Sequence, residues 1–234
     1  MVAIARVKTG IPSLDAIMGG GLPPQSNILV YGEPLCGKKP LIMQYIYQGL
    51  QEGMPGMFVL TDYGVVEWAN MMRQGGWNLE TVKDQSLIHF VDAYTKQFQP
   101  GLEDNPNIAY VEHPSAISSV ALHISSMQDE ILKAGGKEHR LAFHSISSLL
   151  EECDSKTVFN FLHYVTGKFR MAGATALYTM EKGMHSPVEV NMVEHLMDGI
   201  IEFEGENVKV KGIFGSDAQV HAYKITPRGI TIKV

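Results

Sequence analysis

The sequence predicts an α/β fold in which helices flank a mostly parallel central sheet, with a C-terminal antiparallel β extension. Three observations support this prediction. Short apolar runs alternate with helical patterns up to residue 180, as in parallel strands covered by helices. After residue 198, strands follow one another without helices between them. A glycine-rich turn between the first predicted strand of the chain and the helix after it has the spacing of a phosphate-binding loop.

The alternating part of the chain can be divided into individual elements. Strands are expected at residues 27–31, 57–61, 87–91, 141–143 and 174–180. Helices are expected at residues 41–50, 65–73, 117–131 and 158–169. The third helix has the clearest pattern, because its apolar residues recur every three or four positions and Gly135-Gly136 ends the run. Residues 97–114, which contain three prolines, are expected to form a surface loop or lid.

The C-terminal extension is expected to contain four strands. They are placed at residues 199–203, 208–210, 220–225 and 230–234. The segment Thr226-Pro227-Arg228-Gly229 is typical of a turn and joins the last two strands. This pattern predicts a hairpin that continues the sheet at its edge.

Length and composition favour one large domain covering residues 1–234. The chain is 45% hydrophobic and 19% charged, which suits a domain with a substantial core. No run of 18 apolar residues is present, and residues 1–10 lack a signal-peptide pattern, so we expect a cytoplasmic protein without a membrane partner. Cys36 and Cys153 are expected to be free thiols, because they have no C-x-x-C spacing.

The net charge of −6 argues against nucleic acid as a partner, because tight binding usually needs a basic face that displaces phosphate counterions. The nearest basic group comprises Lys209, Lys211, Lys224 and Arg228, which have the pattern of ordinary polar strand faces. The nine histidines show no H-x-x-x-H or H-E-x-x-H spacing, so no metal site of the zinc type is expected.

The strongest local signal is a G-x-x-x-x-G-K motif between the first predicted strand and the helix after it. It consists of Gly32, Glu33, Pro34, Leu35, Cys36, Gly37 and Lys38. In this context, backbone N–H groups and the helix N-terminus surround a phosphate, and Lys38 reaches the outer phosphates. The motif therefore predicts a nucleotide-binding site; the alternative is a tight strand-to-helix turn without a ligand.

The position after the motif departs from the usual pattern. A serine or threonine hydroxyl normally binds Mg²⁺ there, whereas this chain has Lys39, followed by Pro40. A lysine cannot bind a metal ion, so Mg²⁺ binding is not expected. Two interpretations remain open: the Lys39 ammonium replaces Mg²⁺ beside a bound nucleotide, or Lys39 points into solvent.

Motifs along nearly the whole chain resemble those of the KaiC-like branch of the RecA superfamily. Residues 9–15 and 19–23 resemble the family's TGIPGLD and GGGLP segments, and residues 76–80 resemble GWDLE. Residues 198–201 resemble DGVI, and residues 209–212 resemble the K-M-R-G motif. The resemblance implies a RecA-like P-loop fold that binds ATP or ADP between neighbouring subunits of a ring, commonly a hexamer. By position, Lys209 and Lys211 would then reach a neighbour's phosphates; alternatively, they form an exposed pair on a strand.

Compared with this family, two further chemical positions have changed. The Asp-Ser pair of the Walker B strand corresponds to His144 and Ser145, and neutral histidine is a poor ligand for Mg²⁺. The family's catalytic Glu pair corresponds to Asp62 and Tyr63. Asp62 keeps a carboxylate that could act as a base; alternatively, it caps the following helix. His144 is interpreted as a hydrogen-bonded residue rather than a metal ligand.

Because phosphoryl transfer depends on metal and positioned charges, these changes together predict negligible turnover. The sequence therefore favours a degenerate, non-hydrolysing member of the family that acts as a regulatory or assembly subunit. Its partner would be a second copy of itself or an active relative. Two alternatives remain: an active ATPase with displaced ligands, and a nucleic-acid accessory protein of the recombinase type.

Overall fold

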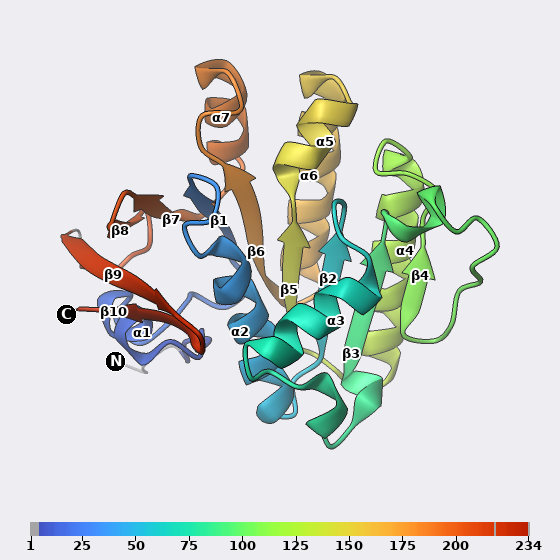
Figure 1. The fold of residues 1–234 in the computed structure, drawn as a ribbon, viewed down its shortest axis with the longest axis horizontal. Coiled ribbons are helices and arrows are strands. Elements are labelled where there is room, and N and C mark those ends of the chain that lie inside the picture. The colour runs from blue at the N-terminus through green and yellow to red at the C-terminus, as the bar shows by residue number, and fades with distance from the viewer. Residues whose placement is uncertain (1–4, 218, 234) are drawn as a thin grey trace.

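The computed structural model describes residues 5–217 and 219–233, and its main feature is a ten-stranded sheet. The strand order is β10-β9-β8-β7-β1-β6-β5-β2-β3-β4, with helices on both faces (Figure 1). The strands from β7 to β4 in this order are parallel, whereas β8, β9 and β10 are antiparallel. This arrangement confirms the predicted fold class.

The strands have the following bounds: β1 Asn27–Gly32, β2 Gly56–Leu60, β3 Ile88–Asp92, β4 Ile108–Tyr110, β5 His139–His144, β6 Ala174–Glu181, β7 Gly199–Glu204, β8 Asn207–Lys211, β9 Val220–Thr226 and β10 Gly229–Ile232. The helices are α1 Pro12–Ile17, α2 Lys38–Gln51, α3 Val65–Gln74, α4 Ile117–Lys133, α5 Ile146–Glu152, α6 Ser155–Met171 and α7 Pro187–Glu194. Three short 3-10 turns are η1 Leu79–Thr81, η2 Gln85–Leu87 and η3 Thr95–Gln97.

Strand β1 occupies the middle of the sheet because it pairs with β6 on one side and β7 on the other. All six of its residues are buried, as expected for a strand covered on both faces. The carboxyl ends of β1, β6, β5, β2 and β3 point to the top of the molecule in Figure 1. In open α/β sheets, ligands bind at this edge.

Two apolar clusters cover the faces of the sheet. One contains the inner side of α2 and α3 together with the β9–β10 hairpin, and the other contains α4 and α6. The clusters separate along each strand because successive side chains point to opposite faces: Ile28 belongs to the first and Leu29 to the second. The sheet is thus fixed from both sides, and its carboxyl edge stays open for a site.

Some elements differ from the prediction. The segment predicted to be a loop or lid, 97–114, contains strand β4, which pairs with β3. That prediction was wrong for Ile108–Tyr110, because the three residues are too few to show an alternating pattern. Helices α1, α5 and α7 were not predicted. The last predicted strand, 230–234, ends at Ile232, and Val234 lies outside the described residues.

No helix in the described ranges has the length and apolar character needed to cross a bilayer.

Candidate functional site

The glycine-rich loop joins the carboxyl end of β1 to the start of α2, as its sequence predicts. Leu35 and Gly37 adopt left-handed backbone conformations, with φ of 64° and 101°, and these turns curl the loop. Glycine is needed at position 37 for two reasons. Its φ is positive, and a Cβ there would come within 2.9 Å of Ile230 in the C-terminal hairpin. The curled loop at a helix N-terminus has the form of a phosphate cradle.

Lys38 is buried beneath this loop, and its ammonium is fully engaged. Nζ donates to the carbonyls of Gly32 and Glu33 at 2.7 and 2.6 Å, and to the Glu181 carboxylate at 2.8 Å. It also lies 3.5 Å from the sulfur of Cys36, a free thiol as predicted. A lysine has three donor hydrogens, so the two carbonyls and the carboxylate use all of them. A phosphate must therefore displace at least one of these partners.

Lys39 does not project into solvent. Its Nζ donates to the Tyr63 hydroxyl at 2.7 Å and lies 4.4 Å from the centre of the same ring. Such a position over an aromatic face attracts a cation. The structure thus brings together Lys39 and Tyr63, the two residues that the sequence comparison predicts to stand at the metal-binding position of the motif and at one catalytic position.

His144 extends this cluster by stacking against Tyr63. The two rings stack with centroids 5.7 Å apart, and Trp68 lies 5.0 Å from the imidazole. His144 Nδ1 is 2.6 Å from the Thr179 hydroxyl, which agrees with a hydrogen-bonded residue. Burial, assisted by the charges of Lys39 and Lys38, lowers the pKa of His144 to about 3, so the ring is neutral at pH 7.

Asp62 lies beside His144 and does not cap the next helix. Its Oδ1 is 3.5 Å from His144 Nε2, and both atoms are buried without a hydrogen-bond partner. Burial raises the pKa of Asp62 to about 6, although the Lys39 ammonium opposes the shift. The capping alternative is wrong: Asp92 instead accepts a hydrogen bond from the first N–H of α3, at Val65, at 2.9 Å.

Ser145 has a structural role in this cluster. Its side chain caps α5 by accepting from the N–H of Ser148 at 3.3 Å. Its own N–H donates to the Thr61 hydroxyl at 2.7 Å. His144 and Ser145 are therefore both held by hydrogen bonds to other protein groups.

Lys209 and Lys211 lie on β8, two strands from β1 in the sheet. Lys211 pairs with Glu202, which also binds Lys182 at 3.1 Å. In the described ranges, no carboxylate lies within 4.0 Å of the Lys209 ammonium. Within the described residues, Lys211 is bonded to Glu202 and neither lysine is bonded to residues 32–39; their role towards a neighbouring subunit stays a prediction.

Glu181 and Lys182 are site residues that the sequence analysis missed. Both come at the end of β6, next to β1, and the backbone N–H of Lys182 donates to the carbonyl of Gly32 at 2.8 Å. One signal could have revealed them. They are the charged pair that directly follows the apolar run 174–180, and the carboxyl ends of neighbouring parallel strands meet at one edge.

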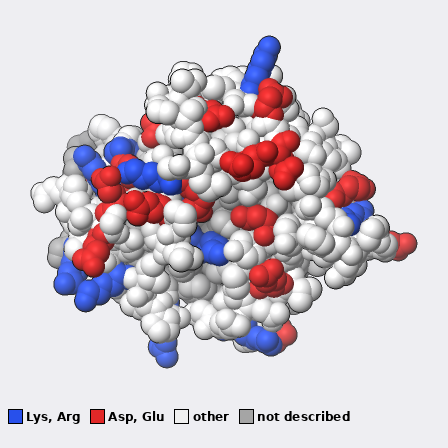
Figure 2. Space-filling model, turned by 45° about the horizontal axis from the view of Figure 1, so that its top comes forward, with Lys and Arg blue, Asp and Glu red and all other residues white. Residues whose placement is uncertain are grey.

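An acidic cavity of about 340 Å³ adjoins Lys38 on the side of Glu181. Its lining includes Asp62, Glu151, Glu152 and Glu181. Figure 2, which brings the carboxyl edge of the sheet forward, shows more acidic than basic side chains around the middle of this face. Outer phosphates held by Lys38 would therefore lie against negative charge.

The residues at three positions of the predicted metal and catalytic site are not ligands that Mg²⁺ prefers. A lysine, a neutral imidazole and a tyrosine stand at positions 39, 144 and 63, whereas Mg²⁺ requires octahedral oxygen ligands. Within the described part of the chain, no three His, Cys, Asp or Glu side chains are grouped closely enough to hold a metal ion. The loop has the form of a phosphate cradle, whereas positions 39, 144 and 63 lack the oxygen ligands that usually accompany Mg²⁺ there.

The sheet order, the loop between β1 and α2, and the buried Lys38 define a RecA-type P-loop domain. The family model for the KaiC ATPases matches residues 7–234. The chain therefore belongs to the KaiC ATPase family.

Relatives of similar length support this membership. A UPF0273 protein of Aeropyrum pernix is 32% identical, with 98% of this chain and 94% of the relative covered. A UPF0273 protein of Methanopyrus kandleri is 27% identical, with 99% and 93% covered. The crystal structure of the KaiC-like protein PH0186 from Pyrococcus horikoshii OT3 superimposes with a TM-score of 0.74 at 22% identity, over 99% of this chain and 100% of that chain. At that identity, the match shows a common fold.

Proposed function

We propose that this chain is a non-hydrolysing KaiC-type domain that binds ATP or ADP weakly and without Mg²⁺, and that it acts as a regulatory or assembly subunit. The observation that carries the proposal is the contact between Lys39 and Tyr63, 2.7 Å from Nζ to the hydroxyl. A cation and an aromatic hydroxyl fill the positions that a metal ligand and a catalytic carboxylate need. The Lys39 ammonium then supplies the positive charge that Mg²⁺ supplies elsewhere.

The absence of suitable metal ligands is the reason to expect no turnover. Phosphoryl transfer is accelerated mainly by metal ions and cations that stabilise charge in the transition state, and by a group that positions the attacking water. Here the buried neutral His144 replaces the metal carboxylate, and Tyr63 replaces one carboxylate of the catalytic pair. The remaining carboxylate, Asp62, lies against His144.

The same proposal includes the organisation of the protein. Residues 1–234 would form one domain, because one sheet includes strands from both halves of the chain. It would act in the cytoplasm, in a homo-oligomer such as a hexamer or with an active KaiC-type relative. In such a ring, Lys209 and Lys211 would face a neighbouring subunit. Nucleic acid is not part of the proposal, given the acidic charge of the chain.

A second candidate function is an active ATPase, and one observation favours it. The pKa of Asp62, raised to about 6 by burial, is close to the value expected for a general base near neutral pH. This alternative predicts phosphate release from ATP that requires Mg²⁺ and disappears in Asp62→Asn. The leading proposal predicts no release above the rate of the Lys38→Ala variant.

Nucleotide binding can be tested through the unfolding temperature of the full-length chain. Millimolar ADP or ATP should raise Tm by a few degrees in EDTA, and Mg²⁺ should not increase the shift, because a ligand bound only by the folded state must stabilise it. ADP should stabilise at least as well as ATP in EDTA, since the outer phosphate of a bound ATP would face the acidic cavity. Differential scanning fluorimetry measures both effects.

The matched variants are Lys39→Ala and Lys209→Ala. Lys39→Ala should remove most of the nucleotide-induced rise in Tm, whereas Lys209→Ala should preserve this rise in the monomer. A shift that appears only with Mg²⁺ would contradict the proposal and support the ATPase. Equal shifts for wild type and Lys39→Ala would contradict the role given to the ammonium.

Removal of the carboxylate at Glu181 should strengthen nucleotide binding. Glu181→Gln leaves Lys38 with a weaker competing partner and removes one negative charge beside the phosphates. Hydrogen bonds to charged groups contribute about 1.5–3 kcal/mol, so we expect the Kd for ADP to fall by about tenfold. Isothermal titration calorimetry in EDTA measures this change. The control is Glu204→Gln, which removes the charge of an exposed partner of Lys182 and should leave the Kd for ADP unchanged. An affinity in Glu181→Gln that is equal to or weaker than that of wild type would disprove competition between Glu181 and the phosphate for Lys38.

A further inference from the structure

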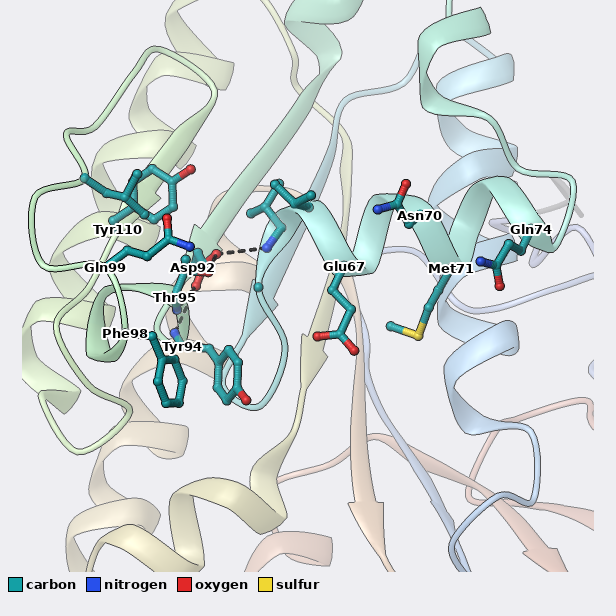
Figure 3. Close-up of a pocket in the computed structure, with 14 residues that line it drawn as sticks. Glu67, Asn70, Met71, Gln74, Asp92, Tyr94, Thr95, Phe98, Gln99 and Tyr110 are labelled. Atoms are coloured by element: carbon teal, nitrogen blue, oxygen red, sulfur yellow. Dashed lines mark hydrogen bonds between the residues drawn. The ribbon is translucent and has the colours of Figure 1, made fainter.

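A second cavity, separate from the phosphate loop, lies between α3 and the segment that follows β3. Its volume is about 630 Å³, which is in the range of small-molecule sites. Figure 3 shows side chains from α3, η3 and β4 around it. Its lining shares no residue with the loop at positions 32–39.

The lining of this cavity carries negative charge without a compensating cation. Among its fourteen residues are two carboxylates, Asp92 and Glu67, and no Lys, Arg or His. Two cations are bonded to lining residues from outside the cavity: Arg73 donates to Asn70 at 3.0 Å, and Lys96 donates to the carbonyl of Tyr110 at 3.1 Å. Neither of them lines the cavity.

Asp92 is completely buried and has a fixed orientation. Oδ1 accepts from the N–H groups of Tyr94 and Thr95 at 2.9 and 2.8 Å. Oδ2 accepts from the N–H of Val65 at 2.9 Å and from the Thr95 hydroxyl at 2.6 Å. All four donors are neutral groups, and the described cations make no ion pair with Asp92. The carboxylate therefore gives the base of the cavity a fixed negative field.

Aromatic rings form another part of the wall. Tyr94 and Phe98 pack against each other with centroids 5.2 Å apart, and Tyr110 lines the cavity from β4. Phe98 is 68% exposed although it is a large apolar residue. In Figure 3, Glu67 extends from α3 on the same side as the Tyr94 ring. Aromatic faces beside carboxylates are the usual recognition elements for organic ammonium ions.

We propose that this cavity binds a small organic cation, an ammonium group attached to an apolar body. The ammonium would lie between Glu67 and the aromatic rings, where the field of Asp92 adds to the attraction. The apolar body would cover Val66 and Phe98, which are largely exposed, and Met71, which is partly buried; all three line the cavity. This site is independent of the nucleotide function proposed above.

The test compares ligands of the same shape and different charge on the full-length chain. Choline and its uncharged isostere 3,3-dimethylbutan-1-ol test the role of charge, and benzyltrimethylammonium tests the apolar body. Isothermal titration calorimetry should show that choline binds at least tenfold more tightly than the isostere, and benzyltrimethylammonium more tightly than choline. Equal affinity for choline and the isostere would overturn the proposal. So would the absence of binding for both ammonium compounds up to about 20 mM, a concentration that already corresponds to very weak binding.

Two substitutions assign the binding to this cavity. Glu67→Gln should weaken benzyltrimethylammonium binding by about threefold, a small factor because Glu67 is exposed to solvent. Phe98→Ala should weaken it by about tenfold through loss of an aromatic face. The matched controls are Glu80→Gln and Phe214→Ala, which change an exposed carboxylate and an exposed ring outside the cavity. Unchanged affinity in both cavity variants would show that the cation binds elsewhere.

Discussion

Arg140→Ala should lower the free energy of unfolding by about 3–5 kcal/mol, because it removes a buried charge that three segments share. Arg140 is only 1% exposed. Its guanidinium donates to the carbonyls of Lys8 and Tyr45 at 2.6 and 2.8 Å, and to the Glu52 carboxylate at 2.6 Å. The substitution leaves both carbonyls without this donor and opens a cavity beside Gly49.

Urea unfolding followed by circular dichroism measures this loss. Arg170→Ala is the matched control. Arg170 also forms an ion pair, with Asp198 at 2.8 Å, but it is half exposed, so its loss should cost at most about 1 kcal/mol. A loss below about 1 kcal/mol in Arg140→Ala would mean that the guanidinium network does not stabilise the fold.

Acid should destabilise the protein before its carboxylates are extensively protonated. Burial lowers the pKa of His144 to about 3 and that of His139 to about 4, so both are neutral in the folded protein. In the unfolded chain they take up protons below pH 6.5. The stability that depends on their neutral state is therefore present above pH 6.5 and is lost as the pH falls toward these folded values.

Asp62 has the opposite effect on the pH dependence of the free energy of unfolding. Its folded pKa of about 6 is above the usual carboxyl value, so below pH 6 the folded protein binds a proton that the unfolded chain does not bind. This offsets part of the effect of the two histidines. From pH 7 to pH 5, we expect a net loss of about 2–4 kcal/mol in the free energy of unfolding.

The slope of this free energy against pH identifies the groups responsible. Replacement of His144 by Gln should reduce the slope between pH 5 and 6 by about 1.4 kcal/mol per pH unit, which corresponds to one proton. His139→Gln should have a similar effect. His163→Gln, at an exposed position, should leave the slope unchanged. If neither buried variant differs from wild type, other groups cause the acid sensitivity.

The sequence was sufficient for the architecture because long elements show their period clearly. The apolar positions of α4 and the buried run of β6 lie where the pattern predicts them. The elements that were not predicted are short, from three residues in β4 to eight in α7. A segment of that length is shorter than the window in which periodicity can be measured. The Pro187 at the start of α7 and the capping box at Ser186 and Glu189 were the available signals.

The candidate site was predictable where it depends on local sequence. The loop from Gly32 to Lys38 was located by spacing alone. The partners of its lysines were not, because Glu181 lies 143 residues from Lys38, and Tyr63 lies 24 residues from Lys39. Such contacts follow from strand order, and the periodicity of single segments does not specify that order. The sequence identified the unusual residues, and the fold decided which of them meet.

The central position of β1 also has a consequence for biosynthesis. Both neighbours of this strand, β6 and β7, belong to the last third of the chain, and the second of them ends at Glu204. A ribosome that has made the whole phosphate loop has therefore not yet made either strand that supports it. The nascent N-terminal half exposes both edges of an apolar strand, and such edges can pair with other chains. During synthesis, the loop becomes a structured site only when the C-terminal strands emerge.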